Sequence, residues 1–227
     1  MLIFIGPTAS GKTTYMKALC SKIKKSGGKC VSITSPPFGG PAFLIIILLS
    51  RILIFSYRPK LFWRRWRGLS VLGTLNPELL SKLLPLLIMA DFAFKVIQHL
   101  AFRVLEKLGL TVLVEDYFPQ MISDHLAFLK LYRDYSKMSK HVITLELRLF
   151  YGYARKSENT MCLHVYADVP IRLMRELKRS GAYMRIAGFY DNVVRNFIPR
   201  ELCRTMNIKT VFIKSTNEGV DKVLSDQ

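Results

Sequence analysis

The sequence predicts a three-layer α/β fold, in which helices cover both faces of a parallel sheet. Short apolar segments alternate along the chain with longer segments of helical periodicity, which is typical of strand–helix–strand units. The chain has 227 residues, half of them hydrophobic, which suits one domain with a sizeable core. The first apolar segment, residues 2–5, leads directly into a glycine-rich loop.

The individual elements follow from local composition. Strands are expected at 2–5, 30–35, 110–114, 161–167 and 210–214, where short apolar runs lie between turn residues. Helices are expected at 13–26, 77–108, 120–138, 144–155, 170–179 and 189–206, with a short one after the last strand. Asn76 before Pro77 is a helix-start signal, and Pro85 marks a potential break.

Residues 36–75 form an insertion of unusual composition. Residues 42–57 are an apolar run of 16 residues that contains Arg51, and such a run is short for a bilayer span of about 20 residues. Residues 58–68 carry five basic residues, no acid and both tryptophans, a composition typical of a membrane interface. Two interpretations stay open: contact with an anionic membrane surface through residues 42–67, or a buried helix followed by a basic surface loop.

The formal charge of +18 favours polyanionic partners, namely nucleotides, nucleic acid or anionic lipid headgroups. A generally basic surface is the alternative. The four cysteines are scattered and form no C-x-x-C pair, so we expect reduced core residues in a cytoplasmic protein, with peripheral membrane contact as an option. The histidines show no spacing typical of a metal site.

The segment from Gly6 to Thr13 matches the phosphate-binding pattern G-x-x-x-x-G-K-[ST]. In such a loop, glycines let the backbone curl around phosphate oxygens, and the following helix presents its positive end. Lys12 would reach the outer phosphates and Thr13 would offer a hydroxyl to Mg²⁺. We therefore predict ATP and Mg²⁺ as cofactors, with the nucleotide bound by Gly6, Pro7, Thr8, Ala9, Ser10, Gly11, Lys12, Thr13 and Thr14.

Two further groups of residues complete the predicted site. Glu115 and Asp116 end a buried strand, so they should lie beside the loop and hold Mg²⁺ or orient the attacking oxygen, with Asp116 preferred. Arg175, Arg179 and Arg185 belong to a basic run that also includes Arg172 and Lys178. We expect these arginines to neutralise phosphate charge from a lid at about 175–190, hinged at Gly181. A solvated basic helix face is the alternative.

These motifs, in this order, resemble the thymidylate kinase family of nucleoside monophosphate kinases. Gly11-Lys12-Thr13-Thr14 resembles the end of the family's loop, and residues 86–91, ending in Asp91, resemble its "lLfaaDR" helix. Residues 112–116 resemble its "visDRY" strand. The likeness also covers the "lDvpPe…R…R" segment and the lid, at Asp168-Val169-Pro170, Arg175, Arg179, Arg185-Ile186 and Phe189.

The resemblance implies a single phosphate-loop kinase domain over residues 1–227. Its activity would be transfer of the ATP γ-phosphoryl group to a nucleoside monophosphate such as dTMP, by a homodimer. Lys12, Asp116, Arg175, Arg179 and Arg185 would be catalytic, and Thr13, Asp116 and Glu115 would hold Mg²⁺.

This chain departs from the family mainly where the acceptor would bind. Thr8, Phe92, Tyr117 and Ala187 stand where the family has an acid, two arginines and a glutamate. An aromatic ring cannot replace the charged fork of an arginine. Two alternatives therefore stay open: a membrane-associated kinase acting on a non-nucleotide or lipid-linked acceptor, and a non-catalytic protein that binds nucleotide or nucleic acid.

The loop sequence also matches that of the tRNA dimethylallyltransferases. Those enzymes follow the loop with an Asp-Ser stretch near the second strand, and residues 32–36 lack it. The rest of that pattern therefore fails.

Overall fold

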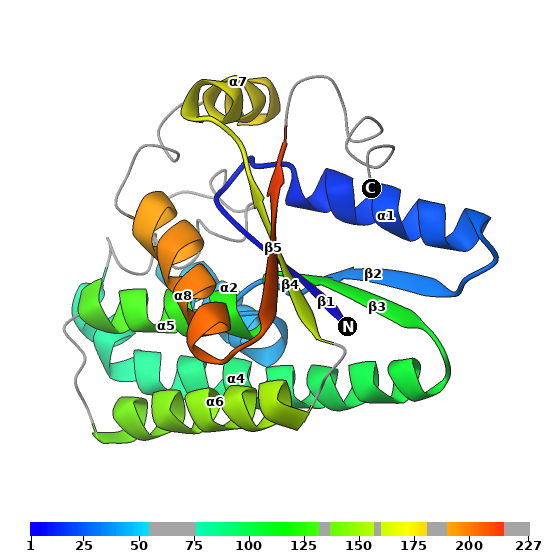
Figure 1. The fold of residues 1–227 in the computed structure, drawn as a ribbon. Coiled ribbons are helices and arrows are strands. Elements are labelled where there is room, and N and C mark those ends of the chain that lie inside the picture. Colours follow the sequence, from blue (N-terminus) through cyan, green and yellow to red (C-terminus); the bar gives the residue numbers. More distant parts are fainter. Residues whose placement is uncertain (55–75, 132–136, 157–159, 181–189, 216–227) are drawn as a thin grey trace.

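The computed structural model describes residues 1–54, 76–131, 137–156, 160–180 and 190–215. Its centre is a five-stranded, all-parallel sheet in the order β2-β3-β1-β4-β5 (Figure 1). This arrangement confirms the predicted α/β class. The strands are β1 (Leu2–Ile5), β2 (Cys30–Thr34), β3 (Thr111–Glu115), β4 (Met161–Tyr166) and β5 (Lys209–Lys214).

Helices cover both faces of the sheet, as predicted. Helix α1 (Lys12–Lys25) lies on one face, whereas α4 (Pro77–Lys107), α5 (Phe118–Leu131) and α6 (Lys137–Lys156) lie on the other (Figure 1). Successive side chains of a strand point to opposite faces, and β1 follows this rule. Ile3 and Ile5 belong to the larger core beneath α4, α5 and α6, and Phe4 belongs to the smaller core beneath α1.

Several helix boundaries differ from the sequence expectation. The helix predicted at 120–138 is described as α5 from Phe118 to Leu131, and residues 132–136 lie outside the described chain. Helix α6 already contains residues 139–143, ahead of the predicted start at 144, because Ser139, Val142 and Ile143 are buried. Helix α4 begins at the predicted signal, where Asn76 Oδ1 accepts from the Leu79 amide over 2.9 Å. It continues through Pro85, since buried residues on both sides of the proline hold it in place.

The C-terminal helical region is divided. A π-helix, η2 (Tyr190–Phe197), precedes α8 (Ile198–Thr205), which has Pro199 in its first turn. The basic helix predicted at 170–179 is α7 (Val169–Ser180). The remainder of the expected lid, including Gly181 and Arg185, and the expected helix after β5 lie outside the described residues.

Within the insertion, the apolar run forms α2 (Gly40–Ile54). Its inner face buries Ala42 and Ile46 in the larger core, against α4. Of the described helices, none is both long enough and apolar enough to cross a membrane. Residues 55–75 lie outside the described part of the chain.

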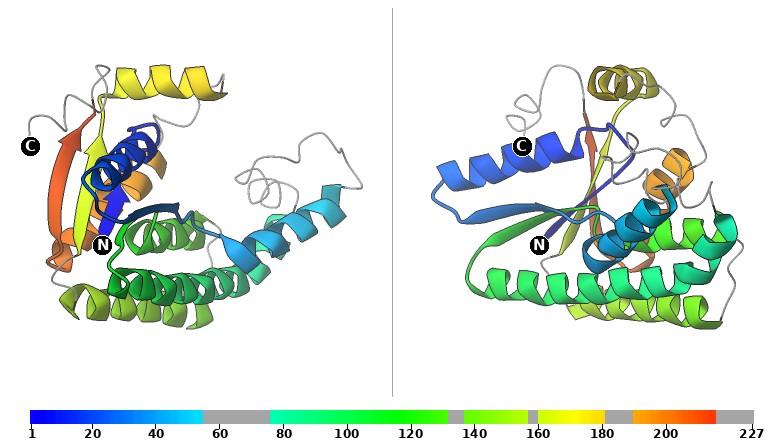
Figure 2. Two further views of the ribbon diagram at one scale, coloured as in Figure 1. Left: turned by 90° about the vertical axis from the view of Figure 1, so that its right-hand side faces the viewer. Right: turned by 180° about the vertical axis from the view of Figure 1, so that it is seen from behind.

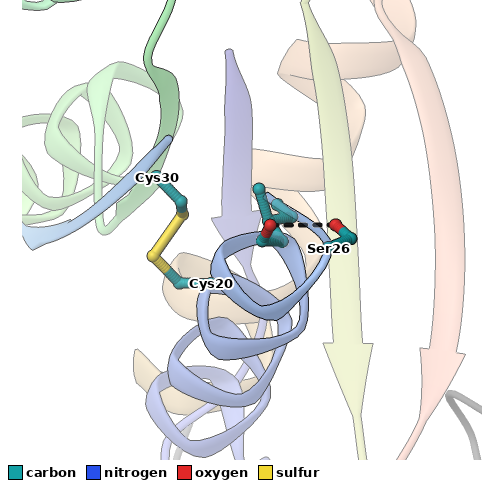
Figure 3. Close-up of a disulfide and its surroundings, with 4 residues drawn as sticks. Cys20, Ser26 and Cys30 are labelled. Atoms are coloured by element: carbon teal, nitrogen blue, oxygen red, sulfur yellow. Dashed lines mark hydrogen bonds between the residues drawn. A yellow bond between two sulfur atoms is a disulfide. The ribbon is translucent and has the colours of Figure 1, made fainter. Parts of the chain in front are cut away.

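The expectation of reduced cysteines is wrong in this structure. Cys20 of α1 is bonded to Cys30 at the start of β2 (Figure 3), and Cys162 of β4 is bonded to Cys203 of α8. The chain reverses between Cys20 and Cys30 through a turn in which Ser26 Oγ donates to the Ile23 carbonyl. The partners are separated by 10 and 41 residues in sequence. No short sequence motif therefore predicts which cysteines pair.

Candidate functional site

The glycine-rich loop lies at the carboxyl end of β1, the central strand. After β1 the chain supplies β2 and β3 on one side of it, and only later β4 and β5 on the other side. In open parallel sheets, ligands bind beyond the carboxyl ends of the strands, at the point where the strand order reverses. The loop occupies that point, and α1 follows it with the glycine Gly11 as its N-cap and no acid in its first turn.

Two glycines are required by the shape of the loop. Gly6 has φ +138°, and a Cβ added to it would lie 2.1 Å from the Val165 carbonyl oxygen of β4. Gly11 has φ +95°, and its Cβ would lie 2.9 Å from Ser215 Oγ. Ala9 between them also has a positive φ, of 58°. Consequently the loop curls tightly against β4, and only residues without side chains fit at its two ends.

Lys12, Thr13 and Glu115 lie close together beside the loop. Thr13 Oγ1 donates to Glu115 Oε2 over 2.6 Å, and Lys12 Nζ lies 3.9 Å from Glu115 Oε1. Lys12 Nζ also donates to the carbonyls of Gly6 and Pro7 at 2.9 and 3.0 Å. The lysine thus bridges the loop backbone and the carboxylate at the end of β3, as the sequence predicts for neighbouring strand ends.

Glu115 and Asp116 have different surroundings. Burial raises the pKa of Glu115, and the neighbouring Asp116 charge raises it further, while Lys12 and the Thr13 hydrogen bond act in the opposite direction. Asp116 is buried, has φ +58°, and its amide donates to the Phe4 carbonyl at 3.4 Å. Of the two carboxylates, Glu115 is the one hydrogen-bonded to Thr13, although sequence reasoning preferred Asp116.

Two arginines of α7 hold the outer side of the loop. Arg172 is buried, and its Nε donates to the Thr8 carbonyl over 3.1 Å. Arg175 Nη1 donates to the Ala9 carbonyl at 3.4 Å and to Ser215 Oγ at 3.1 Å. Arg175 was predicted to face the phosphates. Arg172 was given no role in the predicted site. Its i, i+3 spacing from Arg175 places both arginines on one face of the helix, and this spacing could have indicated that both contact the loop. Arg179 lies one turn further along α7, and its side chain is outside the described set.

The residues of the loop fit a bound triphosphate. Ser10 Oγ is buried and has no hydrogen-bond partner within the described part of the chain. The N-terminus of α1 favours a negative group. No group of three or more His, Cys, Asp or Glu side chains in the described ranges could hold a metal ion. Thr13 and Glu115 are oxygen-bearing side chains that meet beside the loop.

A cavity of about 220 Å³ opens at the carboxyl end of β2. The rings of Phe43 and Phe94 and the side chain of Ile46 line it, with the polar side chains of Lys95 and Gln98. The turn beside it adjoins Glu115, because the Ser35 amide donates to the Glu115 carbonyl over 2.8 Å. The remaining lining residues are Thr34, Pro36, Pro37, Phe38, Gly39 and Gly40.

Lys95 is buried beside this cavity. Its ammonium donates to the carbonyls of Ser35 and Pro36 and to Ser35 Oγ. Burial lowers the pKa of Lys95 to about 8, against the attraction of Asp91, Asp116 and Asp124. The lysine therefore ties the turn after β2 to α4 and places a positive charge close to Asp116.

Sequence reasoning missed a buried charge network behind the cavity. His125 lies between two acids, with Nε2 at 3.1 Å from Asp91 Oδ2 and Nδ1 at 2.8 Å from Glu146 Oε1. Burial alone lowers the pKa of His125, but Glu146 and Asp91 raise it to about 10. Asp91 also accepts from the amides of Phe38 and Gly39 at 2.6 and 3.0 Å. The network thus fixes the turn that forms one wall of the cavity.

Two positions that departed from the resembled family are packed inside the protein. Phe92 is buried in the larger core, and Tyr117 is fully buried with its hydroxyl 2.7 Å from His99 Nδ1. These side chains support the core, and neither offers a charge to an acceptor.

Comparisons with known proteins add little to this geometry. No family model matches the chain, and no curated protein matches it. Among solved structures, TT1252 from Thermus thermophilus aligns over 99% of this chain and 94% of its own, with 16% sequence identity and a TM-score of 0.42.

Proposed function

We propose that the chain is an ATP-dependent phosphotransferase of the phosphate-loop class, with a nucleoside monophosphate such as dTMP as its acceptor. The observation that carries this proposal is the meeting of Lys12, Thr13 and Glu115 at the carboxyl end of the central strand. A glycine-rich turn with no ligand would not need a buried ammonium beside a buried carboxylate, with an exposed hydroxyl hydrogen-bonded to that carboxylate.

The chain's own groups would share the work of binding and positioning. The loop backbone and Ser10 would contact phosphate oxygens, and Lys12 would move from the loop carbonyls toward the outer phosphates. When bound, Mg²⁺-ATP would supply the phosphoryl group, and the positive charge of Mg²⁺ would partly neutralise the negative phosphate oxygens. Glu115 would hold the Thr13 hydroxyl in position, and Arg172 and Arg175 would keep the loop in its curled shape.

The cavity beside β2 is the best candidate for the acceptor. Its aromatic walls and polar end fit a planar heterocycle with hydrogen-bonding edges. It lies two strands from the loop, which corresponds to about 10 Å across the sheet. An acceptor bound there would extend over Glu115 and Asp116 toward the loop.

An assay of ATP consumption with Mg²⁺ tests the proposal. Each nucleoside monophosphate is added in turn, and Lys12→Ala serves as the blank. Lys17→Ala, an exposed lysine of the same helix, is the matched control and should behave as the unaltered protein. Turnover that requires one monophosphate and disappears only in Lys12→Ala supports the proposal. Nucleotide binding without turnover on any monophosphate would contradict it.

A second acceptor class is favoured by one specific observation. Phe43 and Ile46, which line the cavity, come from α2, the same apolar helix that exposes its other side. A phosphorylated or hydroxylated lipid-linked acceptor would approach from there. Turnover restricted to such acceptors in detergent would identify this class.

A further inference from the structure

The strongest unassigned feature of the surface is the outer face of α2, formed by Leu44, Ile45, Leu48 and Ile52. Leu44, Leu48 and Ile52 are 66%, 60% and 62% exposed, although each is large and apolar. They follow one another at four-residue spacing, so they form one continuous stripe along the helix. The opposite side of the same helix is buried in the core. Helix α2 is therefore apolar on both sides, and the core covers only one of them.

The shape of α2 suits the surface of a bilayer. Fifteen residues make a helix of about 22 Å, shorter than the roughly 30 Å of a bilayer's hydrocarbon core. The helix has no charged residue before Arg51. The left view of Figure 2 shows α2, in blue to cyan, running outward from the sheet. Such a helix can lie along an interface with its outer face among the acyl chains.

The charge of the adjoining sequence identifies the partner. The first 77 residues contain twelve Lys and Arg and no Asp or Glu, so they carry +12 of the net +18. Five of these charges, with both tryptophans, lie between Arg58 and Arg67. Arg58 follows Ile54, the last residue of α2, by four residues in the sequence. An apolar stripe next to basic and Trp residues matches the headgroup layer of an anionic membrane.

We propose that the outer face of α2 docks this protein on an anionic lipid bilayer. Pairing of α2 with a second copy would be opposed by the same charges, because each copy would bring its basic segment toward the other. An anionic bilayer instead attracts those charges while it covers the apolar stripe. Docking does not use the residues of the cavity itself, since Leu44, Leu48 and Ile52 do not line it.

Sedimentation of the full-length protein with vesicles tests the proposal. Vesicles of neutral phosphatidylcholine are compared with vesicles that contain about 30% phosphatidylserine, at 0.1 M and 0.5 M salt. We expect binding to the anionic vesicles at low salt, weakened at least about tenfold by high salt, because surface charges are then screened. The variant Leu44→Gln/Leu48→Gln/Ile52→Gln should reduce binding at low salt by at least about tenfold, because it removes the apolar stripe.

A matched control separates this face from exposed apolar residues in general. Ile97, Leu100 and Val104 of α4 are 64%, 60% and 56% exposed, and the variant Ile97→Gln/Leu100→Gln/Val104→Gln should bind vesicles as the unaltered protein does. Retention of the thermal unfolding midpoint in both variants shows that the fold is intact. Absence of binding to anionic vesicles, or an equal loss in the two variants, would overturn the proposal. So would light scattering showing a dimer that only the α2 variant dissociates, without vesicle binding.

Discussion

Thr13 at the start of α1 donates its hydroxyl proton to Glu115 at the end of β3, over 2.6 Å and across 102 residues of sequence. This hydrogen bond joins the end of the glycine-rich loop to the carboxylate of the last residue of the neighbouring strand, β3. Glu115 is in turn only 3.9 Å from the ammonium of Lys12. The three side chains define the centre of the candidate site.

Replacement of Glu115 tests that relationship. In Glu115→Gln the amide oxygen can still accept from Thr13, but the negative charge is lost. We expect turnover to fall by about 100-fold, while nucleotide affinity changes by only a few fold. Steady-state kinetics and fluorescent-nucleotide binding measure the two effects. A larger loss in Asp116→Asn than in Glu115→Gln would instead assign the role to Asp116.

Arg172 should act through the shape of the loop. Arg172→Ala removes the hydrogen bond to the Thr8 carbonyl and should weaken ATP binding by about tenfold, with a loss of about 1 kcal/mol in the free energy of unfolding. Titration calorimetry and urea unfolding check the two values. Lys178→Ala, at an exposed position of the same helix, should change neither quantity. Equal effects in both variants would show that only the general charge of α7 matters.

Gly6 should not tolerate a side chain. In Gly6→Ala the new Cβ would lie 2.1 Å from the Val165 carbonyl at a φ of +138°, so we expect a loss of at least about 3 kcal/mol or failure to fold. Gly27→Ala is the control, because Gly27 has φ +85° with no heavy atom within 4 Å of the added Cβ. It should cost about 1 kcal/mol from backbone strain alone. Chemical denaturation compares the two variants, and equal losses would contradict the steric argument.

The buried network around His125 should make stability depend on pH. His125 keeps its proton in the folded protein up to about pH 10, but an unfolded histidine releases it near 6.5. Its stabilising contribution is therefore complete below pH 6.5 and falls as pH rises toward 10. Lys95, with its pKa lowered to about 8, opposes this trend only above pH 8. Between pH 6.5 and 8 the histidine should reduce the free energy of unfolding by about 2 kcal/mol.

Urea unfolding at pH 6.5 and at pH 8 measures this change. His125→Gln should lack the His125 contribution to it, whereas His141→Gln, on the exposed side of α6, should behave as the unaltered protein. An identical pH dependence in all three proteins would show that His125 does not titrate in this way.

The disulfides should contribute measurably to stability. By loop length, the Cys20–Cys30 bond should contribute about 3 kcal/mol and the Cys162–Cys203 bond about 4 kcal/mol. Unfolding with and without a reducing agent gives the total, and Cys20→Ala or Cys203→Ala removes one bond at a time. Mass spectrometry of the alkylated protein tests the pairing itself. Four alkylated thiols in the non-reduced protein would contradict it.

Much of the fold could be predicted because strands and long helices have local signals. The limits of β1 and the cap of α4 at Asn76 agree with the structure, since both depend on neighbouring residues alone. The start of α6 could not be predicted, because it depends on which face of residues 137–143 meets the core. Nor could the disulfides, whose partners approach only when α1 meets β2 and α8 meets β4.

By itself the sequence determined the order of strands and helices, the glycine-rich loop with Lys12 and Thr13, and the acids that end β3, since each is set by adjacent residues. Only the tertiary structure decided that Glu115 rather than Asp116 is hydrogen-bonded to Thr13, that Arg172 holds the loop, and that His125 joins Asp91 to Glu146. These contacts link residues 21 to 164 positions apart. Their geometry depends on the sheet order and on helix packing, which local sequence patterns do not contain.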